Sequence, residues 1–205
     1  MSSDHKNHRE TQKFKFSENA EKNIKNILKK YPENRKASAV MPLLDIAQRE
    51  SGGWLPLPAI EEVAKYVGMA NIRVLEIASF YSMYNLKPVG KWHLQICQTT
   101  PCWLCGSDEV LKAIFDEIKI KANETSDDKL FTLTAVECLG ACVNAPILQV
   151  NDDYYEDLDY KATVKLLNSL KRNKPINIGS VKERTSEAEK GSKVLEKQRA
   201  KRHVS

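Results

Sequence analysis

The chain has 205 residues, of which 41% are hydrophobic, so it is long enough to bury a core and form one large domain or two small ones. Its apolar runs are much shorter than the ~18 residues that a membrane span requires, so we expect membrane association only through partners. Most of the net charge of +5 lies in residues 181–205, where eight Lys/Arg and four Asp/Glu alternate without aromatic residues, which argues against a nucleic-acid-binding protein.

Residues 1–16 are polar and mixed in charge, and we interpret them as a flexible arm. They contain neither the apolar stretch of a secretory signal nor the Arg/Ser-rich amphipathic pattern of a transit peptide. We therefore expect a reducing compartment, in which the five cysteines of this chain do not form a disulfide framework.

Residues 17–88 show the apolar periodicity of four short helices, which predicts an N-terminal helical bundle. The helices are expected to begin at Ser17, Ser38, Pro58 and Asn71, where Ser17 and Asn71 can cap free backbone amides. An aromatic run that ends this region is interpreted as core and interface packing rather than as a cofactor-stacking site: Phe80, Tyr81, Met83 and Tyr84.

The pattern changes in residues 89–172 to an α/β domain with strands at 92–96, 131–136, 147–150 and 154–158. One helix begins at Ser107, and a last helix is capped by Asp159. The apolar stripe expected to face the core from the first of these helices is Leu111, Ile114, Phe115 and Ile118. The order strand, helix, strand, strand, strand, helix predicts an α/β sandwich of the thioredoxin type. Gly, Ser, Lys and Glu dominate residues 173–205, which we interpret as a basic tail that is disordered or ordered only against a partner.

Two cysteine pairs, Cys97 with Cys102 and Cys138 with Cys142, each follow a predicted strand. We therefore expect both pairs at one end of the same sheet. A four-thiolate site suits Zn²⁺ or an iron–sulfur cluster. Structural zinc sites usually use C-x₂-C knuckles, whereas C-x₄-C with C-x₃-C leaves a wider chelate that can place each pair on one iron of a binuclear cluster.

The residues around the second pair also favour a cluster. Gly140 and Ala141 have almost no side chain, so backbone amides can approach the sulfurs, and the helix that begins at Ser107 offers further donors nearby. Such donors stabilise an added electron against a formal site charge of about −2 when oxidised and about −3 when reduced.

The fifth cysteine leaves an alternative open. Cys102 and Cys105 form a C-x-x-C between a strand and a helix, where a thioredoxin-like dithiol oxidoreductase has its redox pair. On that interpretation Cys102 is a nucleophile, and Cys97, Cys138 and Cys142 have no role. On the metal interpretation Cys105 is the cysteine without a role.

Several motifs resemble a known family, the 24-kilodalton [2Fe-2S] subunits of respiratory complex I, the NADH:quinone oxidoreductase. The cysteine motifs are CQTTPC at 97–102 and ECLGAC at 137–142, followed by NAP at 144–146. The upstream runs SGGWL at 51–55 and SFYSMY at 79–84 are similar to the same family. The likeness extends over roughly residues 17–172.

This resemblance implies a helical bundle followed by a thioredoxin-like ferredoxin domain, with Cys97, Cys102, Cys138 and Cys142 as the ligands of one [2Fe-2S] cluster. Cys105 lies outside the family's ligand set. The family docks on a flavin-containing subunit that oxidises NADH, and its cluster exchanges electrons with the FMN of that subunit. Because this chain has no Gly-rich dinucleotide fingerprint, NADH and FMN are expected on the partner, and catalysis belongs to the assembly.

The resemblance leaves the partner set open. Related subunits serve NAD-linked formate dehydrogenases and hydrogenases, so an equivalent role in one of those assemblies is the main alternative. The expected location is the cytoplasmic side of a bacterial inner membrane as part of a complex, or the mitochondrial matrix for a processed chain.

Overall fold

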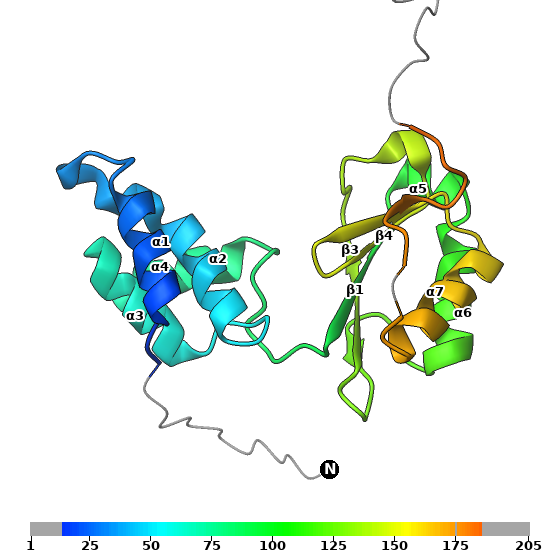
Figure 1. The fold of residues 1–205 in the computed structure, drawn as a ribbon, viewed down its shortest axis with the longest axis horizontal. Coiled ribbons are helices and arrows are strands. Elements are labelled where there is room, and N and C mark those ends of the chain that lie inside the picture. Colours follow the sequence, from blue (N-terminus) through cyan, green and yellow to red (C-terminus); the bar gives the residue numbers. More distant parts are fainter. Residues whose placement is uncertain (1–13, 175, 186–205) are drawn as a thin grey trace, which may run out of the picture. The chain divides into compact units, whose positions relative to one another are not determined.

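The computed structural model describes residues 14–174 and 176–185, and the chain divides into two compact units, Met1–Val89 and Gly90–Ser205 (Figure 1). The first unit contains short helices: α1 (Glu18–Leu28), the 3₁₀ helix η1 (Glu33–Ala39), α2 (Val40–Glu50), α3 (Leu57–Val67) and α4 (Asn71–Phe80). The second unit contains β1 (Trp92–Cys97), α5 (Thr100–Leu104), α6 (Ser107–Ile118), β2 (Glu124–Thr125), β3 (Phe131–Val136), the 3₁₀ helix η2 (Cys142–Asn144), β4 (Ile147–Val150), β5 (Asp153–Glu156), α7 (Tyr160–Lys171) and β6 (Gly179–Ser180).

Local sequence signals explain some of the helix ends in the first unit. The Ser17 hydroxyl accepts a hydrogen bond from the Ala20 amide at 3.2 Å, which confirms the predicted cap of α1. Gly68 ends α3 in the left-handed conformation, with φ of +67°. Asn71 is the first residue of α4 and does not cap it; the capping position is Ala70.

The N-terminal arm ends earlier than expected, because Phe14 and Phe16 pack against the first unit. Phe16 is only 8% exposed, and its ring lies edge-on to those of Phe14 and Tyr66, at centroid distances of 5.0 and 5.5 Å. The arm predicted for residues 1–16 is therefore wrong at its last residues, because burying these rings removes apolar surface from water. Residues 1–13 lie outside the described residues.

The aromatic run at the C-terminal end of α4 packs into the core only in part, and its expected interface packing stays a prediction. Tyr84 is buried and its hydroxyl donates to the Met41 carbonyl at 2.8 Å, as core packing requires. Phe80 is 80% exposed and Met83 is 55% exposed, so these two side chains do not belong to the core of this unit.

The second unit contains a six-stranded mixed sheet with the strand order β2-β3-β1-β4-β5-β6. β1 pairs in parallel with β3 and antiparallel with β4. Helices α6 and α7 lie side by side on one face of the sheet (Figure 1). The structure confirms the predicted thioredoxin-like α/β architecture, which follows a group of N-terminal helices in the chain.

Strand and helix positions in the second unit largely follow the sequence pattern, but the inward face of α6 does not. Ser107, Val110, Ala113 and Ile114 are its buried residues, whereas Phe115 is 43% exposed. The predicted stripe is therefore wrong at Phe115. The small residues Ser107 and Ala113 lie on the inner face of α6 in its place and permit close packing there.

Part of the predicted tail is ordered. β6 pairs in parallel with β5, and the described chain continues to residue 185 (Figure 1). The assignment of all residues from 173 onward to a disordered tail is thus wrong at Gly179–Ser180, which pair with β5, and at Val181, whose amide donates to the Glu156 carbonyl. Residues 186–205 lie outside the described residues.

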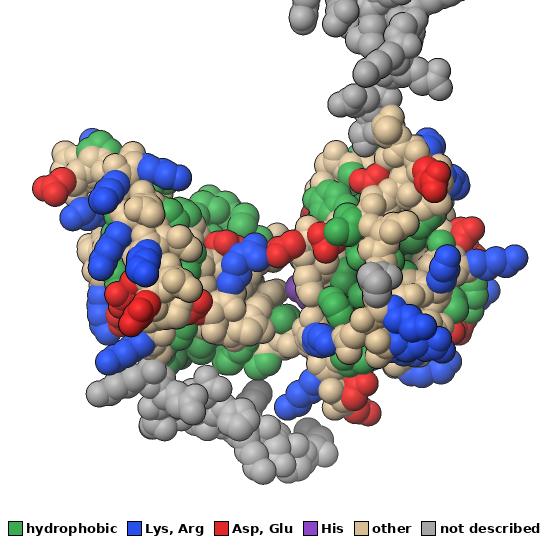
Figure 2. All heavy atoms as spheres, in the orientation of Figure 1, with side chains coloured by type: hydrophobic (Ala, Val, Ile, Leu, Met, Phe, Trp, Pro, Cys, Tyr) green, Lys and Arg blue, Asp and Glu red, His purple; other side chains and the backbone are tan. Residues whose placement is uncertain are grey.

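Acidic and basic side chains are interspersed on the face of each unit that Figure 2 shows. None of the helices in the described part of the chain is long and apolar enough to cross a membrane.

Candidate metal centre

The parallel pairing of β1 and β3 determines where the two cysteine loops begin. Cys97 is the last residue of β1 and lies opposite Val136, the last residue of β3. Cys138 follows two residues later. Because parallel strands end at the same edge of a sheet, both loops start side by side, as expected from the sequence.

The first loop turns back through the short helix α5, which sequence analysis missed. Pro101 lies in the first turn of α5, where its missing N–H costs nothing. This turn brings Cys102 back beside Cys97, and both thiols are 1% exposed. They pack with Ala145 and Ile147 in a small apolar cluster.

The second loop presents its two thiols at the surface. The sulfurs of Cys138 and Cys142 are 3.5 Å apart, and the Gly140 amide donates to the Cys138 sulfur at 3.4 Å. Gly140 has φ of +80°, a conformation that side-chain-bearing residues rarely adopt. Tyr154 on β5 attaches this loop to the sheet, because its hydroxyl donates to the Leu139 carbonyl at 2.9 Å.

Burial and hydrogen bonding together shift the pKa values of the two buried thiols in opposite directions. Burial by itself raises the pKa of Cys97, but hydrogen bonds from the Thr99 hydroxyl and amide, from Cys102 and from the Leu139 amide lower it overall. The Thr99 hydroxyl lies 3.2 Å from the Cys97 sulfur. Burial, followed by the hydrogen bond with Cys97, raises the pKa of Cys102 to about 12. The thiolate form is therefore favoured on Cys97 over Cys102.

The two loops also interact electrostatically with each other. The hydrogen bond with Cys138, followed by burial and by the charges of Cys138 and Cys97, raises the pKa of Cys142. The charge of Cys142 likewise acts on Cys102. These interactions support one site for all four thiols, in which a thiolate already present makes the next one harder to form.

The donor set fits an iron–sulfur cluster. All four thiols are free, two are buried away from water, and backbone amides of Thr99, Leu139, Gly140 and Ile147 lie within reach of a sulfur. Amide donors of this kind compensate the negative charge of thiolates. Within residues 14–174 and 176–185, no group of three or more His, Cys, Asp or Glu side chains is placed to hold a single metal ion. A contribution from the amides at the start of α6 stays a prediction.

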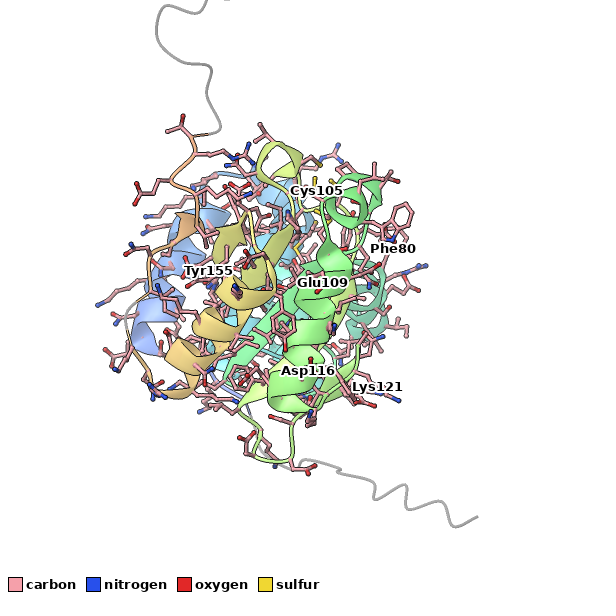
Figure 3. All side chains as sticks on the ribbon, turned by 90° about the vertical axis from the view of Figure 1, so that its right-hand side faces the viewer. Phe80, Cys105, Glu109, Asp116, Lys121 and Tyr155 are labelled. Atoms are coloured by element: carbon pink, nitrogen blue, oxygen red, sulfur yellow. The ribbon has the colours of Figure 1, made fainter. Side chains whose placement is uncertain are left out.

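Cys105 differs from this set in its environment. It is exposed and caps the C-terminal end of α5. Figure 3 shows it at the opposite end of the second unit from Lys121. A redox C-x-x-C needs an accessible nucleophile with a lowered pKa, whereas Cys102 is buried and its pKa is raised. The geometry does not favour the dithiol interpretation.

Three residues of the site were not identified from sequence. Thr99 lies inside the first cysteine motif, so a hydroxyl two positions after a thiol was a usable signal. Tyr154 and Arg184 reach the second loop from distant parts of the chain; Arg184 donates to the Val143 carbonyl at 3.2 Å. No local pattern marks either contact.

A family model for the thioredoxin-like [2Fe-2S] ferredoxins matches residues 24–171. The chain belongs to this family. As a thioredoxin-like ferredoxin it is 55% identical over 147 residues to a subunit of the NADH-quinone oxidoreductase of Rickettsia conorii (strain ATCC VR-613 / Malish 7), covering 72% of this chain and 88% of that one. It is 47% identical over 166 residues to the mitochondrial NADH dehydrogenase [ubiquinone] flavoprotein 2 of Dictyostelium discoideum, covering 81% of this chain and 67% of that one.

Among solved structures, the thioredoxin-like ferredoxin is similar to a chain of an NAD⁺-reducing [NiFe]-hydrogenase in the H₂-reduced state. The TM-score is 0.60 at 16% identity, and the match covers 69% of this chain and 24% of the hydrogenase chain. At that identity the likeness concerns the fold alone.

Proposed function

We propose that this chain is the [2Fe-2S] electron-transfer subunit of an NADH:quinone oxidoreductase, a respiratory complex I. The observation that carries the proposal is the convergence of two thiol pairs at the ends of the parallel strands β1 and β3. Family membership and relatives named as subunits of NADH-quinone oxidoreductase support it. The enzyme activity belongs to the assembly, in which this chain is an electron carrier.

Cys97, Cys102, Cys138 and Cys142 are the proposed ligands. A [2Fe-2S] cluster, when bound, accepts and releases one electron at a time. Cys97 and Cys102 would hold the buried side of the site and exclude water from it. The exposed pair, Cys138 and Cys142, would hold the side that faces a partner.

The protein's own hydrogen-bond donors tune this site. The amides of Leu139, Gly140 and Ile147 and the Thr99 hydroxyl supply partial positive charge around four thiolates. They favour the more negative, reduced state and so oppose the low potential that four thiolates impose.

The proposed electron donor is the FMN of a partner subunit that oxidises NADH. The proposed location is the cytoplasmic side of a bacterial inner membrane, or the mitochondrial matrix, with membrane association only through the complex. The exposed thiol pair supports direct contact with a partner at this end of the second unit.

The ligand set is tested on the full chain, purified without oxygen. We expect two irons and two sulfides per chain and, after reduction, the electron paramagnetic resonance signal of a binuclear cluster. Changing Cys102 to Ser should abolish or shift this signal, whereas the matched control Cys105→Ser should leave it unchanged. A colourless protein with stoichiometric zinc, or loss of the signal in Cys105→Ser alone, would contradict the proposal.

The partner set is tested by affinity purification from the native cell under conditions that keep complexes intact. We expect an NADH-oxidising flavoprotein together with quinone-reductase subunits. Recovery of formate dehydrogenase or hydrogenase subunits in their place would retain the cluster but assign the chain to a different assembly.

A further inference from the structure

A segment after α7 returns to the metal centre. We call residues 178–184 the C-terminal strap. It contains β6, and the Val181 amide continues the pairing by donating to the Glu156 carbonyl at 3.1 Å. Figure 1 shows this orange segment running from the C-terminal end of α7 toward the end of the unit that carries α5. The strap lies beyond residues 24–171, which match the family model.

A buried carboxylate anchors the strap. The side chain of Asp157 is 1% exposed. It accepts hydrogen bonds from the Ser180 hydroxyl at 2.6 Å and from the Arg184 guanidinium, whose Nε lies 3.0 Å away and whose Nη2 bonds the other carboxylate oxygen. A buried charge is tolerated only when it is paired and hydrogen-bonded, so Asp157 fixes Arg184 in one position.

Arg184 connects this anchor to the cysteine loop. Its Nη2 also donates to the carbonyl of Val143, the residue directly after Cys142. The same turn, η2, is held by two further bonds: the Asn144 side-chain amide donates to Glu156 at 2.6 Å, and the Asp157 amide donates to the Asn144 carbonyl at 2.7 Å. The backbone that carries Cys142 is thus attached both to β5 and to the strap.

We propose that Arg184 is a positioning residue of the metal centre, which holds the Cys142 loop through its contacts with Asp157 and Val143. The inference rests on the proposed ligand set. Cys142 is exposed and follows Gly140 and Ala141, which have almost no side chain to pack, so contacts from other segments keep its sulfur in place. Because Arg184 is paired with a carboxylate, its effect comes from the position of the loop more than from net charge.

The test compares iron release from the full chain to a chelator without oxygen in wild type and in Arg184→Gln. We expect release to be about tenfold faster in the variant, since a hydrogen bond to a charged group contributes roughly a factor of ten. The reduced variant should also show altered g-values, because the geometry at Cys142 changes. Arg184→Lys keeps the charge but loses the bidentate contact with Asp157, so its rate of iron release should lie between those of wild type and Arg184→Gln.

Lys182→Gln is the matched control. It removes the same charge from the same strap, but Lys182 contributes its backbone amide, not its side chain, to the Ser180 hydroxyl. We expect iron release and g-values close to wild type. Equal effects of Lys182→Gln and Arg184→Gln would overturn the positioning role in favour of a charge effect.

Hydrogen–deuterium exchange on the metal-free chain provides a readout that needs no cluster. In Arg184→Gln the amides of Asn144 and Ala145, which close the η2 turn, should exchange faster than in wild type. Unchanged exchange would overturn the inference. A wild-type chain that binds no iron would contradict the proposed function, whereas wild-type iron with an unaffected Arg184→Gln would contradict this inference alone.

Discussion

Gly140 shows how much a single backbone conformation contributes to the site. With φ of +80° it lets its own amide turn toward the Cys138 sulfur. A Cβ at this position would meet no atom within 4 Å, so the requirement for glycine is conformational and not steric. Left-handed backbone costs a residue with a side chain roughly 1–2 kcal/mol.

Gly140→Ala is therefore expected to accelerate loss of iron and to lower the free energy of unfolding by roughly 1 kcal/mol. The measurement is the decay of visible absorbance without oxygen, together with denaturant unfolding. Gly68→Ala is the matched control, since Gly68 also has positive φ with no neighbour near its Cβ position, but ends a helix in the other unit. Equal rates of iron loss in the two variants would show that the loop conformation does not matter.

At the same scale, sequence identified the thiols but not what supports them. The spacing and strand-end positions of Cys97 and Cys138 follow from local patterns, so their convergence was predictable. Arg184 contacts Val143 from 41 positions away, and that contact depends on the return of the chain after α7. Interactions of this kind exist only in the folded structure.

Among the elements, the long and strongly periodic ones were predictable, and the short ones were not. β3 and α7 begin where alternation and the Asp159 cap place them. α5, β2 and β6 have five, two and two residues, too few to show a period of their own. The two strands pair with backbone of β3 and β5 that lies elsewhere in the sequence, whereas α5 is a single local turn closed by bonds such as that from the Trp103 amide to the Thr99 carbonyl.

One tyrosine connects two elements of the first unit and gives it a pH dependence. Tyr84 follows α4, and its hydroxyl donates to Met41 in α2. Burial, then the nearby charge of Asp45 and the neighbouring Tyr81, raises the pKa of Tyr84 from 10.0 to about 12. A raised pKa in the folded state means that the stabilisation is complete below pH 10.0 and is lost as the pH rises toward about 12.

We expect the free energy of unfolding of wild type to fall more steeply over this alkaline range than that of Tyr84→Phe. Below it, the variant should be less stable by about 1 kcal/mol, because one hydrogen bond is lost. Denaturant unfolding at a series of pH values measures both effects. Other tyrosines titrate in both proteins, so the informative quantity is the difference, and parallel pH profiles would contradict the assignment to Tyr84.

The whole molecule has a separate hydrophobic core in each unit. Leu44 is fully buried in the core of the first unit, and Leu148 is fully buried in the core of the second. The two cores share no residue. Leu148 lies on β4 directly after Ile147, and Ile147 packs with Cys97.

Truncating either leucine to alanine should cost about 2–5 kcal/mol in the unit that contains it. Leu44→Ala is expected to increase hydrogen exchange in the first unit while the paramagnetic signal of the reduced protein keeps its line shape. Leu148→Ala should increase exchange in the second unit and accelerate loss of iron. If Leu44→Ala released iron as fast as Leu148→Ala, the two cores would not be energetically separate.

Both edges of the sheet are formed by strands of only two residues, β2 and β6. An incoming strand from another copy would find few free backbone donors and acceptors on either side, and short edge strands are one way in which proteins avoid forming a template for added chains. We therefore expect these short edges to lower the tendency of the sheet to pair with a strand of another copy.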